Sequence, residues 1–182
     1  EGFWSGPAFE LTGPVAKVRP AQGGGMLEFF SPPRQDATPV DSVVWQVVDL
    51  RAAQDFITAN GTVDLKAWVQ FNRVAGDAHS ASKFRVSVAA FRGKPTDAAA
   101  LWAKRSETAL AYGEKEISTD NNPATWEKVE AVAQISAVAD FAVLEVRAIA
   151  PKDTPPGVNP FPGHFADLMD AKVCIPLRSS RK

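Results

Sequence analysis

One side of an alternating segment, 63–72, carries the residue types best suited to bind a ligand. Trp68 lies between Lys66 and Gln70 on that side, and Asn72 follows two residues later. An indole ring offers a flat surface for the C–H face of a sugar, and polar neighbours can bind its hydroxyls. The pattern therefore predicts a binding surface at these four side chains. The alternative, which the energetics of aromatic burial favour, is that Trp68 packs beneath a loop.

Charged residues also stand on the polar sides of two other alternating segments. Arg85 lies on that side of 83–91, and Glu145 and Arg147 lie on that side of 141–149. If these strands neighbour the first one, their polar sides form one continuous surface. We therefore add these three charged residues to the predicted binding surface.

Aromatic residues near predicted loops or termini offer an alternative place for binding. They are Trp4, Trp102, Tyr112 and Phe161. Loops often carry function, so such rings can form a platform at a loop tip. Phe161, in the sequence Pro160-Phe161-Pro162, is instead expected to pin its loop to the body of the domain.

Hydrolytic chemistry has little support in the sequence. The chain has two histidines, His79 and His164, and lacks the Gly-x-Ser-x-Gly turn that would expose a serine nucleophile. It also lacks a Gly-x-x-x-x-Gly-Lys phosphate loop. His164 is expected to contact a backbone carbonyl and brace the last strand, and Cys174 is expected to be a small buried hydrophobe. We therefore predict no catalytic residues, with a hydrolase as the least favoured hypothesis.

The segments that must position these side chains read as strands. They are 43–50, 63–72, 83–91, 110–119, 126–135, 141–149 and 168–175. Only two short helices are expected, at 52–57 and 96–104, and Asn60-Gly61 is a turn signal. Strands with Pro/Gly turns and no long helix predict an all-β fold, a two-sheet antiparallel β-sandwich or jelly roll. Its core is expected to include Trp45, Phe71, Phe84 and Trp126.

Length and composition set the remaining limits. The 182 residues predict a single domain, 1–182, with 1–7 and 178–182 as peripheral tails. The 20 Lys+Arg balance 21 Asp+Glu, which excludes an obvious nucleic-acid-binding charge. The longest apolar run, 98–103, is far below the roughly 18 residues of a membrane-spanning helix. Because the chain opens at Glu1, we expect a processed piece of a longer protein.

Five short motifs occur in order along the chain. They are Ala8-Phe9-Glu10, Gly23-Gly24-Gly25-Met26-Leu27-Glu28-Phe29, Trp45-Gln46-Val47-Val48-Asp49-Leu50, Pro123-Ala124-Thr125-Trp126-Glu127-Lys128-Val129 and Gly163-His164-Phe165-Ala166-Asp167. This order, over residues 8–177, resembles the galactose-binding-like jelly-roll domains, the fold of many carbohydrate-binding modules attached to bacterial glycoside hydrolases. The chain departs from that pattern in lacking Asn-Gly before Phe-Glu and in its Pro-rich loop 151–162.

The resemblance implies a metal and a function. In similar modules, acidic residues matching Glu10 and Asp167 hold a structural Ca²⁺ with loop carbonyls, since calcium prefers hard oxygen ligands. The alternative is that both are ordinary surface or turn-capping carboxylates. The expected function is a non-catalytic carbohydrate-binding module within a larger extracytoplasmic protein, whether secreted, periplasmic or at the cell surface. The alternative is a structural or protein-interaction domain of a cell-envelope regulatory protein, because fold does not determine function.

Overall fold

Ten antiparallel strands are the main elements of the part of the chain that the structure describes. The computed structural model describes residues 4–6, 9–30, 41–74, 83–120, 122–136, 138–155 and 158–176. The strands are β1 (Trp4–Ser5), β2 (Phe9–Thr12), β3 (Met26–Phe29), β4 (Ser42–Asp49), β5 (Val63–Arg73), β6 (Lys83–Phe91), β7 (Ala111–Ser118), β8 (Glu127–Ile135), β9 (Phe141–Ile149) and β10 (His164–Cys174).

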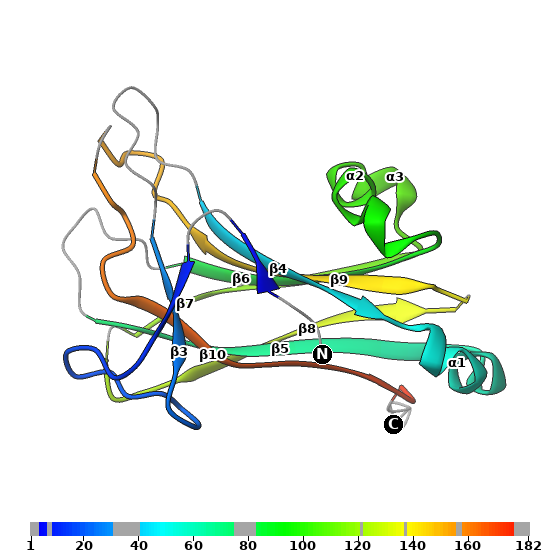
Figure 1. Ribbon diagram of the computed structural model, residues 1–182, viewed down its shortest axis with the longest axis horizontal. Helices are drawn as coiled ribbons and strands as arrows, with labels where there is room; N and C mark the ends of the chain where they lie inside the picture. The colour runs from blue at the N-terminus through cyan, green and yellow to red at the C-terminus, as the bar shows by residue number, and fades with distance from the viewer. Residues whose placement is uncertain are drawn as a thin grey trace, which may run out of the picture.

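The strands form two five-stranded sheets that face each other (Figure 1). The first sheet has the order β1-β4-β9-β6-β7, and the second sheet has the order β2-β3-β10-β5-β8. Every pair of hydrogen-bonded strands is antiparallel. The expected all-β, two-sheet jelly-roll sandwich is therefore confirmed.

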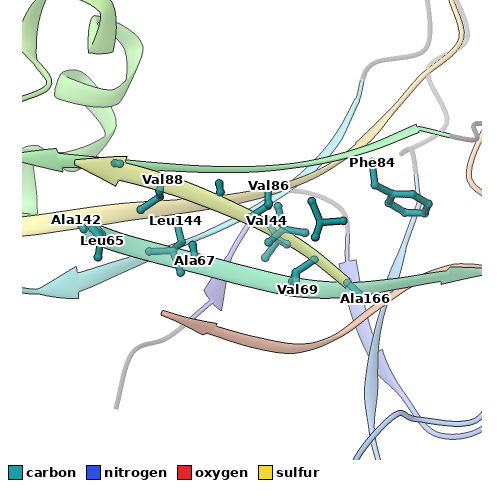
Figure 2. Packing of buried hydrophobic residues seen from close by; sticks show 14 of the residues in the cluster. Val44, Leu65, Ala67, Val69, Phe84, Val86, Val88, Ala142, Leu144 and Ala166 are labelled. Atoms are coloured by element: carbon teal, nitrogen blue, oxygen red, sulfur yellow. The ribbon is translucent and has the colours of Figure 1, made fainter. Parts of the chain in front are cut away.

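Period-two alternation sends one side of each central strand into the space between the sheets. In β5, the inward residues Val63, Leu65, Ala67 and Val69 are at most 1 % exposed, whereas the outward residues Asp64, Lys66, Trp68 and Gln70 are half-buried. Figure 2 shows such side chains from both sheets meeting in one apolar layer. Phe71 and Phe84 stack in this core with ring centroids 4.4 Å apart, as the sequence predicts.

The two sheets also meet along one edge, where β7 of the first sheet contacts β8 of the second. Gly113 of β7 makes this contact possible. A Cβ atom at Gly113 would lie only 2.0 Å from the carbonyl oxygen of Val132 in β8. Glycine is required here for close approach of two backbones, which closes the sandwich on this side.

Short helices cover the outer face of the first sheet and one end of the sandwich. They are η1 (Arg51–Ala53), α1 (Gln54–Asn60), η2 (Pro95–Asp97), α2 (Ala98–Ala103) and α3 (Arg105–Thr108). Figure 1 shows α2 and α3 together on the outer side of the first sheet, where Ala98, Leu101 and Trp102 of α2 join a second apolar cluster with Phe91, Phe141 and Val143. Helices form at both expected places, but as five short elements of the described residues: η1 and α1 around 52–57, and η2, α2 and α3 around 96–104. No helix of the described residues is long and apolar enough to cross a membrane.

Several single-residue expectations are confirmed and others are corrected. Phe161 is 1 % exposed, and Nδ1 of His164 lies 3.1 Å from the carbonyl oxygen of Pro162. Cys174 is half-buried and pairs with Asp64 in register, so the prediction of a buried cysteine is wrong. Alternation places Cys174 on the outer face of the second sheet, because strand register determines which side of a sheet a residue occupies.

The predicted core positions of Trp45 and Trp126 are also wrong. Both were expected in the core, but both are only partly buried and pack against smaller clusters outside the main apolar layer. Trp45 packs with the cluster beneath α2, and Trp126, directly before β8, packs with Val18, Met26 and Phe165. Nε1 of Trp126 donates a hydrogen bond to the carbonyl of Arg19 at 3.0 Å, which ties it to the segment between β2 and β3.

Candidate functional site

Trp68 lies on the outer face of the second sheet, half-buried, at the centre of what we call the Trp68 face: Lys66, Trp68, Gln70, Lys128 and Lys172. The ammonium groups of Lys128 and Lys172 lie 5.0 Å and 5.6 Å from its ring centroid. A cation within about 6 Å of an indole centroid is attracted by the ring quadrupole. The ring is therefore already contacted by two charged side chains of the neighbouring strands.

Asn72 does not share this open surface. It is fully buried, and its side-chain amide donates to the carbonyl of Pro123 at 3.1 Å. Residues 13–25 cover this end of the sheet, where Val18 packs with Met26 and Phe165. Of the four residues predicted on β5, three remain on the uncovered part of the face.

Arg85, Glu145 and Arg147 lie on the opposite side of the molecule. Their strands, β6 and β9, belong to the first sheet, whereas β5 belongs to the second. The structure therefore does not bring these residues together with Trp68 in one cleft. Alternation in sequence shows which side of a strand faces the core, but long-range pairing decides which strands are neighbours.

The outer face of the first sheet carries a hollow of about 620 Å³ beside the two short helices. We call it the α2–α3 groove. Its lining residues are Arg85, Ala103, Arg105, Ser106, Ala109, Tyr112 and Glu114. Its size lies within the range of about 300–1,000 Å³ typical of small-molecule sites.

Tyr112 and Arg105 line this groove, and the ring of Trp102 packs against both of them. The rings of Trp102 and Tyr112 lie 6.3 Å apart between centroids. The guanidinium carbon of Arg105 lies 4.9 Å from the centroid of Trp102 and 5.7 Å from that of Tyr112. Tyr112 is 40 % exposed, so part of its ring faces solvent. These are two of the aromatic residues that the sequence assigned to loops or termini as an alternative platform.

A chain of polar contacts holds Trp102 against the sheet. Its Nε1 donates to Oε2 of Glu145 at 3.0 Å, and Glu145 is only 4 % exposed. Nε of Arg147 donates to the other oxygen of Glu145 at 3.0 Å, and Arg147 also donates to Asp41 at 2.9 Å. Glu145 and Arg147 therefore position α2 and its indole, with their own polar atoms engaged inside the protein.

Arg85 forms a charged part of the groove lining. It donates to Oε2 of Glu116 at 2.8 Å, and its Nη1 lies 3.6 Å from Oε2 of Glu114. The hydrogen bond to Glu116 raises the pKa of Arg85, and the same bond lowers the pKa of Glu116, with Lys83 adding to that effect. Nε of Arg85 is buried and has no hydrogen-bond partner among the described residues.

A smaller apolar hollow of about 150 Å³ lies on the other side of Trp102. It is lined by Trp45, Ala98, Ala99, Trp102 and Val143. Trp102 therefore lines the apolar hollow, and Arg105, which stacks on its ring, lines the polar groove. Helical spacing alone does not give this arrangement, because Trp102 lies in α2 and Arg105 begins α3, with a break at Lys104.

The two residues assigned to calcium occupy different surroundings. Glu10 pairs in register with Glu28 of β3, and burial together with the charge of Glu10 raises the pKa of Glu28. The carboxylate of Asp167 accepts amide hydrogen bonds from Ala21 at 2.7 Å and Gln22 at 3.2 Å.

Strand order separates these two carboxylates further. Strands lie about 4.8 Å apart, so β2 and β10, with β3 between them, are about 10 Å apart. The described residues contain no group of three or more His, Cys, Asp or Glu side chains suited to a metal. Glu10 and Asp167 therefore lie on strands that are not neighbours, and a calcium ion held by both together with loop carbonyls stays a prediction. His79 lies outside the described residues.

The chain was compared with known proteins. No protein-family model matches it, and no curated protein matches its sequence. Solved structures that match include an arabinose-bound α-L-arabinofuranosidase, with 12 % identity, a TM-score of 0.46, and coverage of 93 % of this chain but only 23 % of that chain.

Two further matching structures are carbohydrate-binding modules. One is the xylan-binding domain CBM22-1 of Xyn10C from Paenibacillus barcinonensis, with 15 % identity, a TM-score of 0.40, and coverage of 96 % of this chain and 87 % of that one. The other belongs to a study of modules from the β-sandwich superfamily, with 8 % identity, a TM-score of 0.40, and coverage of 94 % and 56 %. These values concern the sandwich fold only and do not indicate what this chain binds.

Proposed function

We propose that this chain is a non-catalytic carbohydrate-binding module of a larger extracytoplasmic protein, and that its glycan lies in the α2–α3 groove. The observation that supports this most is a partly exposed tyrosine ring, Tyr112, at the edge of a hollow of about 620 Å³. Aromatic rings bind the C–H face of sugars, and the charged and hydroxyl groups beside Tyr112 offer donors and acceptors to sugar hydroxyls.

The groove suits a glycan better than the Trp68 face does. The ring of Trp68 is contacted by two cations, the ammonium groups of Lys128 and Lys172, whereas the ring of Tyr112 is contacted by one, the guanidinium of Arg105. Tyr112 instead borders an open volume, and Ser106 and Arg85 line the same hollow. The Trp68 face therefore serves as the comparison surface in the test of this proposal.

The carboxylates at the groove support a binding role without catalysis. Glu145 is buried, and both of its oxygens accept hydrogen bonds, from Trp102 and Arg147. Glu114 accepts a hydrogen bond from the hydroxyl of Tyr112. Glycoside hydrolysis needs a pair of carboxyl groups that are free to exchange protons with substrate or water. Glu145 is not free in this way, because both of its oxygens are engaged.

The test is binding of the full chain to a panel of soluble polysaccharides by affinity electrophoresis, followed by calorimetry. We expect Tyr112→Ala to weaken binding about tenfold or more, which corresponds to about 1.4 kcal/mol of lost stacking. Trp68→Ala, a matched loss of an aromatic ring from the opposite face, is expected to leave affinity unchanged. Loss of binding in Trp68→Ala alone would move the site to the other sheet, and no binding to any polysaccharide would overturn the proposal.

A further inference from the structure

Arg105 is distinguished from the other arginines around the groove by its lack of a carboxylate partner. Arg85 is paired with Glu114 and Glu116, and Arg147 is paired with Asp41 and Glu145. Within the described part of the chain, Arg105 makes no ion pair. Its positive charge at the groove is therefore not neutralised by the described residues.

The surroundings of Arg105 hold its guanidinium in place without using most of its hydrogen-bond donors. The group lies over the rings of Trp102 and Tyr112, and one donor contacts the carbonyl oxygen of Trp102 at 3.3 Å. The planar guanidinium stacks on aromatic faces and matches two oxygens of an anion with its parallel N–H groups. A stacked guanidinium of this kind is organised in advance for an oxyanion.

The opposing charge of Glu114 has to be considered, because it lines the same groove. Its carboxylate already accepts the hydroxyl hydrogen of Tyr112 and lies 3.6 Å from Arg85. That cation offsets its charge locally. An anion is therefore expected near Arg105 and Ser106, where a hydroxyl group adds a further donor.

We propose that Arg105 makes the α2–α3 groove selective for anionic glycans, whose charge is carried by a uronic-acid carboxylate or a sulfate ester. This inference rests on the proposed function and specifies the ligand class of the same site. Both anions present two or more oxygens in a plane that the guanidinium can bind at once. Neutral glycans can still stack on Tyr112 but lack the group that Arg105 binds.

The experiment compares matched neutral and charged glycans on the full chain. The pairs are methyl-esterified and free polygalacturonate, unsubstituted xylan and glucuronoxylan, and dextran and dextran sulfate, each measured by calorimetry at low and high salt. We expect the anionic member of a pair to bind about tenfold or more tightly at low salt, with a smaller difference at high salt. Preference for the anionic member within the first two pairs identifies a carboxylate as the group that is bound. Such a preference within the third pair alone identifies a sulfate ester.

Variants at position 105 separate direct contact from general attraction. Arg105→Gln is expected to abolish the preference while keeping the weaker binding of the neutral member, and Arg105→Lys is expected to restore only part of it. Lys104→Gln is the control, because it removes the same charge from the exposed neighbouring residue outside the groove. If Lys104→Gln loses the anionic preference as fully as Arg105→Gln does, the preference comes from general electrostatic attraction, and the proposed role of Arg105 is wrong.

The outcomes distinguish this inference from the proposed function. If neutral and charged members bind equally to the unmodified chain, the anionic preference is wrong and glycan binding stands. If Arg105→Gln weakens both members to the same extent, Arg105 serves only to hold the rings, and the preference is again wrong. If no member of any pair binds, the proposed function fails and this inference fails with it.

Discussion

Replacing Gly113 with alanine is expected to destabilise the domain, because β7 lies backbone to backbone against β8 at this residue. The added Cβ would lie 2.0 Å from the oxygen and 2.5 Å from the carbon of the Val132 carbonyl, and 3.0 Å from the amide nitrogen of Ala133. Comfortable contact between heavy atoms lies at about 3.5–4.0 Å. The two strands must therefore separate by an amount on the order of 1 Å, since no side-chain rotation can relieve a clash with backbone.

The size of the expected destabilisation depends on which atoms the added methyl group would overlap. Inserting a methyl group into a packed interior costs about 1–3 kcal/mol, and a clash with two backbone segments belongs at the upper end. For a domain of this size each kcal/mol lowers Tm by about 2–4 °C, so we expect a fall of about 6–12 °C. Thermal melting followed by circular dichroism and urea titration both measure it.

Gly24→Ala is the matched control for this prediction. A Cβ at Gly24 would meet no atom within 4 Å, and its backbone carries no positive φ. Its Tm is expected to stay within about 2 °C of the unmodified chain or to rise slightly, because alanine restricts the unfolded chain. If Gly113→Ala has the same Tm as Gly24→Ala, the backbones of β7 and β8 do not lie as close together at Gly113 as described. If Gly113→Ala lowers Tm and also weakens glycan binding, the contact between β7 and β8 also positions the neighbouring groove residue Tyr112.

The remaining predictions concern charged residues. Burial and the charge of Glu10 raise the pKa of Glu28 above 4.5, so ionisation of Glu28 destabilises the folded state. Glu28→Gln should therefore raise Tm at neutral pH and leave Tm unchanged below pH 4.5. Equal changes in Tm at both pH values would contradict the raised pKa. Glu145→Leu leaves Arg147 without one of its two partners and should lower the free energy of unfolding by about 3 kcal/mol in urea titration, and an unchanged midpoint would refute this. Calcium at Glu10 and Asp167 stays a prediction: a bound ion would raise Tm as Ca²⁺ increases to about 10 mM, Glu10→Gln would abolish the rise, and a flat titration would contradict calcium binding.

The fold class and the inward sides of the central strands could be predicted from the sequence. Val63, Leu65 and Val69 alternate with polar residues, and burial of one side of a pleated strand is a local property. The turn at Asn60-Gly61 could also be predicted from the sequence, because it depends on local backbone conformation: Gly61 has a positive φ of 72°, which glycine tolerates. Phe161 also followed from local sequence, because prolines on both sides restrict where its loop can run.

The grouping of the candidate site was decided only by the tertiary structure. Trp68 and Arg85 both lie on outward sides, but hydrogen bonding of β5 to β8 and of β6 to β7 places them on opposite faces of the molecule. Arg105 meets Tyr112 across the segment that joins α3 to β7, and its missing carboxylate partner is a property of the assembled groove. The sequence alone determined the alternation that builds two stacked sheets, because that pattern repeats every second residue. Only the tertiary structure decided which outward side chains share a surface, because strand pairing joins residues that are distant along the chain.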